Sequence, residues 1–219
     1  QIIQHLKSGQ RELLDRPCPV VAPGHLLVQT RASVISAGTE KMLVEFARGG
    51  LLAKARQQPE RVRQAIEKVK TDGLLSTVDA IRNRLDQPIP LGYSSAGRVV
   101  AVGADVAGIE VGDRVASNGP HAEVAHVPMN LCAKLPENVG DADAAFSVLG
   151  AISLQGVRLL KPELGETVTV YGLGLLGLLA VQLLVNSGVK VIGIDIDDAR
   201  LDLAESFGAI PINAASYPD

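Results

Sequence analysis

The sequence of 219 residues is poor in cysteine and in aromatic side chains: it has two cysteines, no tryptophan and 3% aromatic residues. Cys18 and Cys132 stand far apart, and their spacing does not form a cysteine-based metal cluster. Scarce aromatic rings leave no stacking surface for single-stranded nucleic acid. We therefore expect a cytoplasmic protein with reduced thiols.

Long hydrophobic runs and a strong charge of either sign are also absent. The formal net charge is −3, which is too close to zero to favour nucleic acid or an anionic membrane as a partner. Gly or Asn interrupts each apolar run well before the roughly 20 residues that a membrane span needs. With 47% hydrophobic residues, the chain can bury the core of one large or two modest domains.

The most informative stretch is residues 168–200. In order, it shows a short apolar strand at 168–171, glycines at 172, 174 and 177, an apolar helical run at 178–185, a second strand at 190–194 and then Asp195. This order of strand, G-x-G-x-x-G turn, helix, strand and acid is typical of a dinucleotide-binding unit. The alternative is an ordinary glycine-rich turn.

Each residue type in this unit has a physical role. The first glycine permits a tight turn, the second lets the backbone approach a pyrophosphate, and the third lets the helix and strand pack closely. Asp195 would accept hydrogen bonds from the adenosine ribose hydroxyls and repel a 2′-phosphate, so NAD is predicted rather than NADP. The predicted cofactor-binding residues are Gly172, Gly174, Leu175, Leu176, Gly177, Asp195, Ile196 and Arg200. For Arg200, stacking on adenine and a plain exposed position on the next helix both remain open.

Before this unit, the chain alternates between strand-like and helical segments. Period-two strands are expected at 26–32, 97–102, 113–116 and 121–127, with residues 34–40 as a strand end running into a loop. Residues 41–86 read as three or four short helices with ten Lys and Arg against six Asp and Glu. This block is either a solvated helical face or a basic lid that attracts an anionic substrate. One helix is expected from Asp141 into the glycine-rich unit.

Four segments resemble the medium-chain dehydrogenase/reductase superfamily of the zinc alcohol dehydrogenase type: A-G-T-E at 37–40, L-G-Y-S-S-A-G-R-V at 91–99, V-G-D-R-V at 111–115 and G-L-G-L-L-G at 172–177. S-N-G-P-H-A-E-V, N-L-C-A-K-L-P and G-A-I-S-L-Q-G-V-R are closer still to the N-terminal module of bacterial bi-domain oxidoreductases. The resemblance implies a fused C-terminal oxidoreductase module and a homo-oligomer.

The fold implied is α/β, with two parts. Residues 1–145 would form a GroES-like β-rich substrate and catalytic domain with a helical insertion at about 41–86. Residues 146–219 would form the first half of a Rossmann NAD-binding domain, because too few residues follow Leu164 for both halves. We accordingly expect this sequence to be a fragment of a longer protein.

The metal positions of zinc members depart from the family pattern. By this resemblance, Ala37, Tyr93 and Ala151 occupy the three ligand positions, and Ser94 replaces a neighbouring Glu. None of the three suits zinc, so no metal is predicted. Without a Lewis acid, a hydroxyl must position the substrate oxygen and move its proton.

Thr39 matches the family's proton-relay hydroxyl, and Tyr93 stands at a former ligand position, so these two are the predicted catalytic residues. Their alternatives are a loop hydroxyl and a core aromatic ring. Glu40 is expected to be structural, His121 is a candidate acid or base, and Gln155 is expected near the nicotinamide.

The sequence thus predicts a zinc-independent, NAD-dependent oxidoreductase acting on a polar small molecule such as a sugar or nucleotide-sugar. Two alternatives remain open. One is an NADPH enzyme of the quinone-reductase type, and the other is a cofactor-holding or scaffold module of a multidomain protein.

Overall fold

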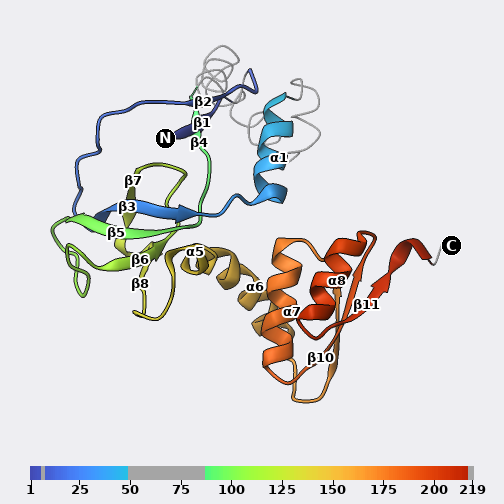
Figure 1. The fold of residues 1–219 in the computed structure, drawn as a ribbon. Helices are drawn as coiled ribbons and strands as arrows, with labels where there is room; N and C mark the ends of the chain where they lie inside the picture. Colours follow the sequence, from blue (N-terminus) through green and yellow to red (C-terminus); the bar gives the residue numbers. More distant parts are fainter. Residues whose placement is uncertain (6–7, 49–86, 217–219) are drawn as a thin grey trace, which may run out of the picture. The chain divides into compact units, whose positions relative to one another are not determined.

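The computed structural model describes residues 1–5, 8–48 and 87–216, and for residues 43–48 it describes the backbone alone. Contacts within the chain divide it into two compact units, Gln1–Pro136 and Glu137–Asp219. The helical insertion expected at 41–86 lies outside the described residues beyond position 48. Each unit is treated by itself below (Figure 1).

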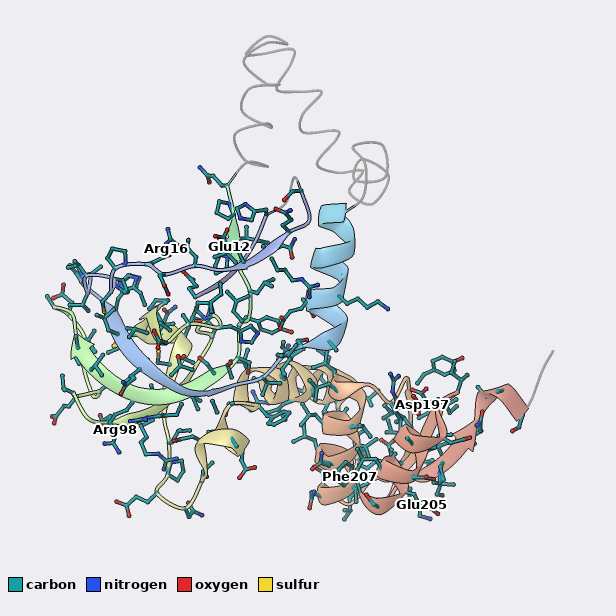
Figure 2. The ribbon with its side chains drawn as sticks, turned by 45° about the horizontal axis from the view of Figure 1, so that its top comes forward. Glu12, Arg16, Arg98, Asp197, Glu205 and Phe207 are labelled. Atoms are coloured by element: carbon teal, nitrogen blue, oxygen red, sulfur yellow. The ribbon has the colours of Figure 1, made fainter. Side chains whose placement is uncertain are left out.

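The first unit is built on a five-stranded antiparallel sheet in the order β7-β3-β5-β6-β8. Its strands are β3 (His25–Ser33), β5 (Ser95–Val102), β6 (Arg114–Ser117), β7 (Val124–Pro128) and β8 (Cys132–Lys134), with the short helix η1 (Met129–Leu131) before β8. The strong curl of β3 and β5 is visible in Figure 2. The predicted strands are present, each within a few residues of its expected bounds.

Alternation along the strands buries one face of this sheet. Leu26 and Val28 of β3 are fully buried, and Val99, Val115 and Val127 join them from β5, β6 and β7. Because strand side chains alternate between faces, these positions form one continuous apolar core. Leu27 and Ala116, at intervening positions, are also buried, so the opposite face is covered there as well.

A second, smaller sheet pairs β1 (Ile2–Gln4) with β2 (Arg11–Leu13) and β4 (Ile89–Pro90) in the order β2-β1-β4. Helix α1 (Ala37–Arg48) follows β3 after a short connection. The prediction of a loop through residue 40 was therefore wrong, since Thr39 and Glu40 lie in the first turn of α1. The Glu40 carboxylate accepts a hydrogen bond from the Ser36 amide at 2.9 Å, which satisfies a backbone donor just before the helix begins.

The second unit contains a parallel sheet in the order β11-β10-β9, the arrangement expected when each strand is followed by a crossover helix. Its elements are α5 (Asp141–Ala144), α6 (Ser147–Leu160), β9 (Thr167–Tyr171), α7 (Leu175–Asn186), β10 (Lys190–Asp195), α8 (Asp198–Ser206), β11 (Ile210–Asn213) and η2 (Ala214–Ser216). Both α7 and α8 pack against β10, and α6 packs along α7 (Figure 1).

The core of this unit lies between the sheet and its helices. Leu173, Val181 and Leu184 around α7 pack with Val191 of β10 and Leu201 of α8, each at most 5% exposed. Most of these core residues lie in the apolar segments from which the strands and helix of residues 168–200 were predicted.

One predicted helix boundary differs from the structure. The single helix expected from Asp141 is two helices, because the Phe146 amide bonds Asp143 O three residues back and interrupts the α-helical ladder. The start of α7 at Leu175 agrees with the free helix amides that the sequence places at Leu175 and Leu176, although the apolar run itself begins at Leu178.

The contact boundary falls after Pro136, whereas the predicted domain boundary between 145 and 146 falls inside the second unit, between α5 and α6. The division of roles between a catalytic domain and an NAD-binding domain stays a prediction. In the part of the chain that the structure describes, no helix has the length and hydropathy of a membrane span.

Candidate functional site

The glycine turn joins β9 to α7 in the second unit. Gly172 has φ +89°, a conformation that side-chain-bearing residues rarely adopt, and its amide bonds Ile194 O at 2.8 Å. A Cβ on Gly177 would lie 2.0 Å from the Gly172 carbonyl oxygen. Only glycine at 177 therefore lets the first turn of α7 come this close to the end of β9.

The N-terminus of α7 has the chemistry of an anion site. Gly174 is its N-cap, and no side chain caps the helix. The amides of Leu175, Leu176 and Gly177 belong to the first turn, where no intrahelical acceptor exists, and the helix dipole places partial positive charge there. A Cβ on Gly172 or Gly174 would meet no atom within 4 Å, so the backbone is open to close approach. These residues fit a pyrophosphate.

Asp195 ends β10 beside this turn and is 8% exposed. Its Oδ2 accepts from the Leu173 amide at 2.6 Å, and its Oδ1 accepts from the amides of Ile196 at 2.8 Å and Asp197 at 3.1 Å. The Leu173 hydrogen bond is the largest cause that holds the pKa of Asp195 below its usual value. The Asp197 and Ile196 amides and the Arg200 charge add to it, while burial opposes it. Asp195 is thus an ionised acceptor tied directly to the glycine turn.

Arg200 lies in the first turn of α8 and faces two carboxylates. Its Nη1 is 3.6 Å from Asp195 Oδ2, and its Nε is 3.5 Å from Asp197 Oδ2. Asp197, labelled in Figure 2, caps α8 by accepting from the amides of Ala199 and Arg200. Ile196 is 73% exposed next to Asp195. The predicted residues at the end of β10 are thus adjacent to one another, although their contact with a cofactor stays a prediction.

A hollow of about 420 Å³ adjoins the glycine turn within the second unit, lined by residues of α6, β9 and α7 that include Gly172, Leu176 and Gly177. Ser153 of α6 also lines it, and the Ser153 hydroxyl donates to Leu176 O at 2.9 Å. The sequence prediction had singled out Gln155, which is exposed on α6 and does not line this hollow. Ser153 was missed because helical phase by itself does not show which hydroxyl faces a neighbouring helix.

In the first unit the two predicted catalytic residues come together. Tyr93 follows β4, and its hydroxyl lies 2.9 Å from Ser36 Oγ and 3.3 Å from Thr39 Oγ1. Ser36 is buried, whereas Tyr93 and Thr39 are half-buried. We call these three side chains the hydroxyl cluster. It joins residues 57 positions apart, from the start of α1 and the segment before β5.

Beside the hydroxyl cluster lies a histidine–glutamate pair. His121 Nε2 is 3.2 Å from Glu40 Oε1, and His121 Nδ1 is 2.9 Å from Ser33 Oγ. His121 and Glu40 are both 8% exposed, while Ser33 is exposed. The sequence identified Glu40 and His121 one by one but not their pairing, because 81 residues separate them.

The three residues that the resemblance aligns with zinc ligands are Ala37, Tyr93 and Ala151. Ala37 begins α1, Ala151 is exposed on α6, and the Tyr93 hydroxyl is engaged by Ser36. Among the described residues there is no group of three or more His, Cys, Asp or Glu side chains that could hold a metal ion.

Comparison with known proteins shows a domain match in part of the chain. Residues 64–157 match the family model of the alcohol dehydrogenase GroES-like domain. A probable D-xylulose reductase A from Aspergillus clavatus is 29% identical over 157 residues, which cover 57% of this chain and 44% of that protein.

Solved structures share the fold along nearly the whole chain. Galactitol-1-phosphate dehydrogenase from Escherichia coli has a TM-score of 0.74 at 21% identity, covering 100% of this chain and 62% of its own. A short chain alcohol dehydrogenase from E. coli CFT073, complexed with NADH, has a TM-score of 0.74 at 24% identity, covering 99% and 63%. A quinone oxidoreductase from Pseudomonas syringae pv. Tomato DC3000 has a TM-score of 0.70 at 24% identity, covering 100% and 59%.

The two kinds of likeness, in sequence and in fold, agree with the motifs at 37–40, 91–99, 111–115 and 172–177. Residues 64–157 thus match the alcohol dehydrogenase GroES-like domain in sequence, and the chain shares the fold of solved dehydrogenases and quinone oxidoreductases. It spans less than half the length of the D-xylulose reductase and about three fifths of the length of the three solved structures.

Proposed function

We propose that this chain contributes the substrate-binding part and the first half of the cofactor-binding part of a nicotinamide-dependent oxidoreductase. The cofactor is NAD, which supplies the hydride acceptor or donor when bound. The reaction moves hydride between NAD and a polar metabolite such as a sugar or nucleotide-sugar, without zinc. The observation that carries the proposal is the ionised Asp195 carboxylate bonded to the Leu173 amide inside the glycine turn.

The cofactor preference is supported by charge. Asp195 would accept from ribose hydroxyls, while a 2′-phosphate would bring negative charge against a carboxylate that is held ionised. Arg200 is within 3.6 Å of both Asp195 and Asp197, so two carboxylates already offset its charge. This arrangement favours NAD.

Zinc independence is supported by the hydroxyl cluster. The Tyr93 phenol stands at a former ligand position with Ser36 and Thr39 hydroxyls around it. In this proposal Tyr93 Oη and Thr39 Oγ1 position the substrate oxygen by hydrogen bonding, and Tyr93 holds the proton that the oxygen gains or loses.

A polar substrate is supported by the relatives, which include a D-xylulose reductase and a galactitol-1-phosphate dehydrogenase. The basic block at 41–86 would serve an anionic group of that substrate. Substituting Arg61, Arg63 and Lys68 together by Ala tests this, with an expected rise in KM for a phosphorylated polyol and none for its uncharged counterpart. An unchanged KM for the phosphorylated polyol in the variant would contradict the role.

Calorimetric titration of the protein with NADH and with NADPH, together with metal analysis of the same sample, tests the proposal. We expect NADH to bind at least tenfold more tightly than NADPH, and zinc to be well below one equivalent. Asp195→Ala should lose most of this preference, whereas Asp202→Ala, an exposed acid on α8, should retain it. Stoichiometric zinc would overturn the proposed zinc independence, and tighter binding of NADPH than of NADH would overturn the proposed preference for NAD.

Turnover is then measured with D-xylulose, galactitol 1-phosphate and a quinone as candidate substrates. Reduction of the quinone with NADPH but not with NADH would favour the quinone-reductase alternative. Binding of neither cofactor would favour the scaffold alternative, in which chemistry belongs to a fused C-terminal module. A cytoplasmic homo-oligomer is part of the proposal, and light scattering of the purified protein measures its mass.

A further inference from the structure

Of the ion pairs given by the described residues of the first unit, His121–Glu40 is the most buried, and the proposed reaction does not yet use it. The His121 side chain is 8% exposed and that of Glu40 is 11% exposed. A Cβ on Gly92, which has φ +86°, would lie 2.7 Å from three atoms of the His121 ring. The imidazole is therefore held flat against the backbone immediately before Tyr93.

Hydrogen bonding determines which ring nitrogen carries a proton. A carboxylate oxygen only accepts, so in the arrangement with an ionised Glu40 the proton on His121 Nε2 faces Glu40 Oε1 at 3.2 Å. Nδ1 then faces the Ser33 hydroxyl at 2.9 Å, which donates to a neutral ring and accepts from a charged one. In both protonation states the His121–Glu40 hydrogen bond remains.

The same carboxylate oxygen also holds Ser36. Glu40 Oε1 accepts from the Ser36 amide at 2.9 Å, and the Glu40 amide donates to Ser36 O at 2.8 Å. One residue thus engages both backbone polar groups of Ser36. The Ser36 hydroxyl in turn contacts the Tyr93 hydroxyl at 2.9 Å. The order of contacts is His121, Glu40, Ser36, Tyr93.

We infer that the buried His121–Glu40 pair is the positioning element of the hydroxyl cluster. His121 orients the Glu40 carboxylate, Glu40 clamps Ser36, and Ser36 holds the Tyr93 phenol where it meets the substrate oxygen. No proton passes from Tyr93 to His121 in this arrangement, because the contact between Ser36 and Glu40 runs through the Ser36 backbone. The inference rests on the proposed function for its catalytic consequence, although not for the contacts.

The test compares Glu40→Ala with Glu40→Gln. Alanine removes the acceptor of both hydrogen bonds, whereas glutamine keeps an oxygen for the Ser36 amide and for His121 Nε2. Glu12→Ala is the matched control, since it breaks a His5–Glu12 pair of the same 3.2 Å length whose side chains are 34% and 53% exposed. Glu12 lies on β2 (Figure 2).

The first readout is the ¹³Cζ resonance of Tyr93, observed by NMR after labelling with ¹³C-tyrosine. The chain has three tyrosines, and Tyr93→Phe assigns the signal. We expect Glu40→Ala to shift or broaden this resonance, Glu40→Gln to restore most of its position, and Glu12→Ala to leave it unchanged. His121→Phe, which keeps a ring over Gly92 but removes the donor, should also shift it.

The second readout is turnover with the substrate found in the panel above. Misplacing a catalytic hydroxyl by a fraction of an ångström should lower kcat roughly 10- to 100-fold in Glu40→Ala. The NADH dissociation constant should stay within about twofold of the unsubstituted value, because the glycine turn and Asp195 are intact. Glu40→Gln should lose less kcat than Glu40→Ala.

An unmoved Tyr93 resonance in folded Glu40→Ala and His121→Phe proteins would overturn the inference. If Glu40→Ala does not fold, His121→Phe and Glu40→Gln still decide it. A Tyr93 shift without any NADH binding would retain the positioning role and reject the proposed function. Normal NADH binding and turnover with an unmoved Tyr93 resonance would support the proposed function and reject the positioning role.

Discussion

At the residue scale, Gly92 shows how one missing side chain supports a site 29 positions away along the chain. Its Cα lies under the His121 ring, and the ring is held by Glu40 and Ser33. Gly112 has a similar φ of +96° but would meet no atom within 4 Å if it carried a Cβ. A side chain at Gly112 would therefore meet backbone strain alone, whereas a side chain at Gly92 would meet both backbone strain and a steric clash with His121.

Gly92→Ala is expected to destabilise the protein more than Gly112→Ala. Both variants place alanine at positive φ, but only Gly92→Ala also pushes the buried ring, a difference of about 1–3 kcal/mol in the free energy of unfolding. Urea denaturation of both variants measures the difference. Equal losses would show that His121 moves aside at no cost.

Asp195 is expected to make stability depend on acid pH. Its pKa is lowered in the folded state, chiefly by the Leu173 amide, so the folded protein binds the proton less tightly than the unfolded chain does. The contribution is complete above the unfolded value of about 3.9 and is lost as pH falls through the folded pKa.

Denaturation at a series of pH values from about 6 down to 3 measures this effect. The unsubstituted protein should lose more stability over the range than Asp195→Asn, because asparagine cannot gain the proton. Asp202→Asn, at an exposed position on α8, should follow the unsubstituted protein. Parallel curves for all three proteins would contradict the role of the Leu173 hydrogen bond.

At the scale of elements, the junction of β9 and α7 depends on close backbone approach. The N-terminal amides of α7 become available only because Gly177 lets the helix start directly after the turn. Gly150 also lies in a helix, α6, yet a Cβ there would meet nothing within 4 Å. Helix propensity is therefore the main difference that alanine makes at Gly150.

Gly177→Ala and Gly150→Ala should have opposite effects on stability. Alanine at 150 should stabilise α6 by up to about 1 kcal/mol, as alanine does in place of an interior helix glycine. Alanine at 177 would force the helix and strand apart at a backbone contact, with a loss of about 1–3 kcal/mol and weaker NADH binding. Thermal denaturation and NADH titration of both variants check this, and a stabilised Gly177→Ala protein would contradict it.

At the scale of the whole molecule, the two compact units allow cofactor binding to be localised. The glycine turn, Asp195 and Arg200 all belong to the second unit, whereas the hydroxyl cluster and the His121–Glu40 pair belong to the first. Local opening of each unit can be followed separately by amide hydrogen exchange.

NADH should slow hydrogen exchange at residues 172–200. A ligand at 100 times its dissociation constant stabilises its folded site by about 2.7 kcal/mol, which corresponds to roughly 100-fold slower exchange through opening of that site. Amides in the core of β3 and β5 should change much less. Mass spectrometry of exchanged peptides measures both regions, and protection confined to β3 and β5 would contradict the cofactor site.

Features that depend on neighbours along the chain could be predicted from the sequence. The strand, turn and helix at 168–185 follow from apolar periodicity and glycine spacing, and the motifs at 37–40 and 91–99 carry the resemblance to alcohol dehydrogenases. Adjacent residues are connected by covalent geometry, so their types restrict the local backbone before any tertiary contact forms. The first of the short helices predicted near residue 41 begins earlier, at Ala37. Its first turn holds Gly38 and Thr39, and a tertiary context that includes the Glu40 side chain stabilises it.

Which distant side chains meet depends on the tertiary fold. Glu40 and His121 are separated by 81 residues, and Ser36 and Tyr93 by 57, so no period or spacing connects either pair. Ionisable groups that are buried away from water need hydrogen-bonding partners. The pairing of β3 with β5 and β7 brings the segments that carry these partners close together.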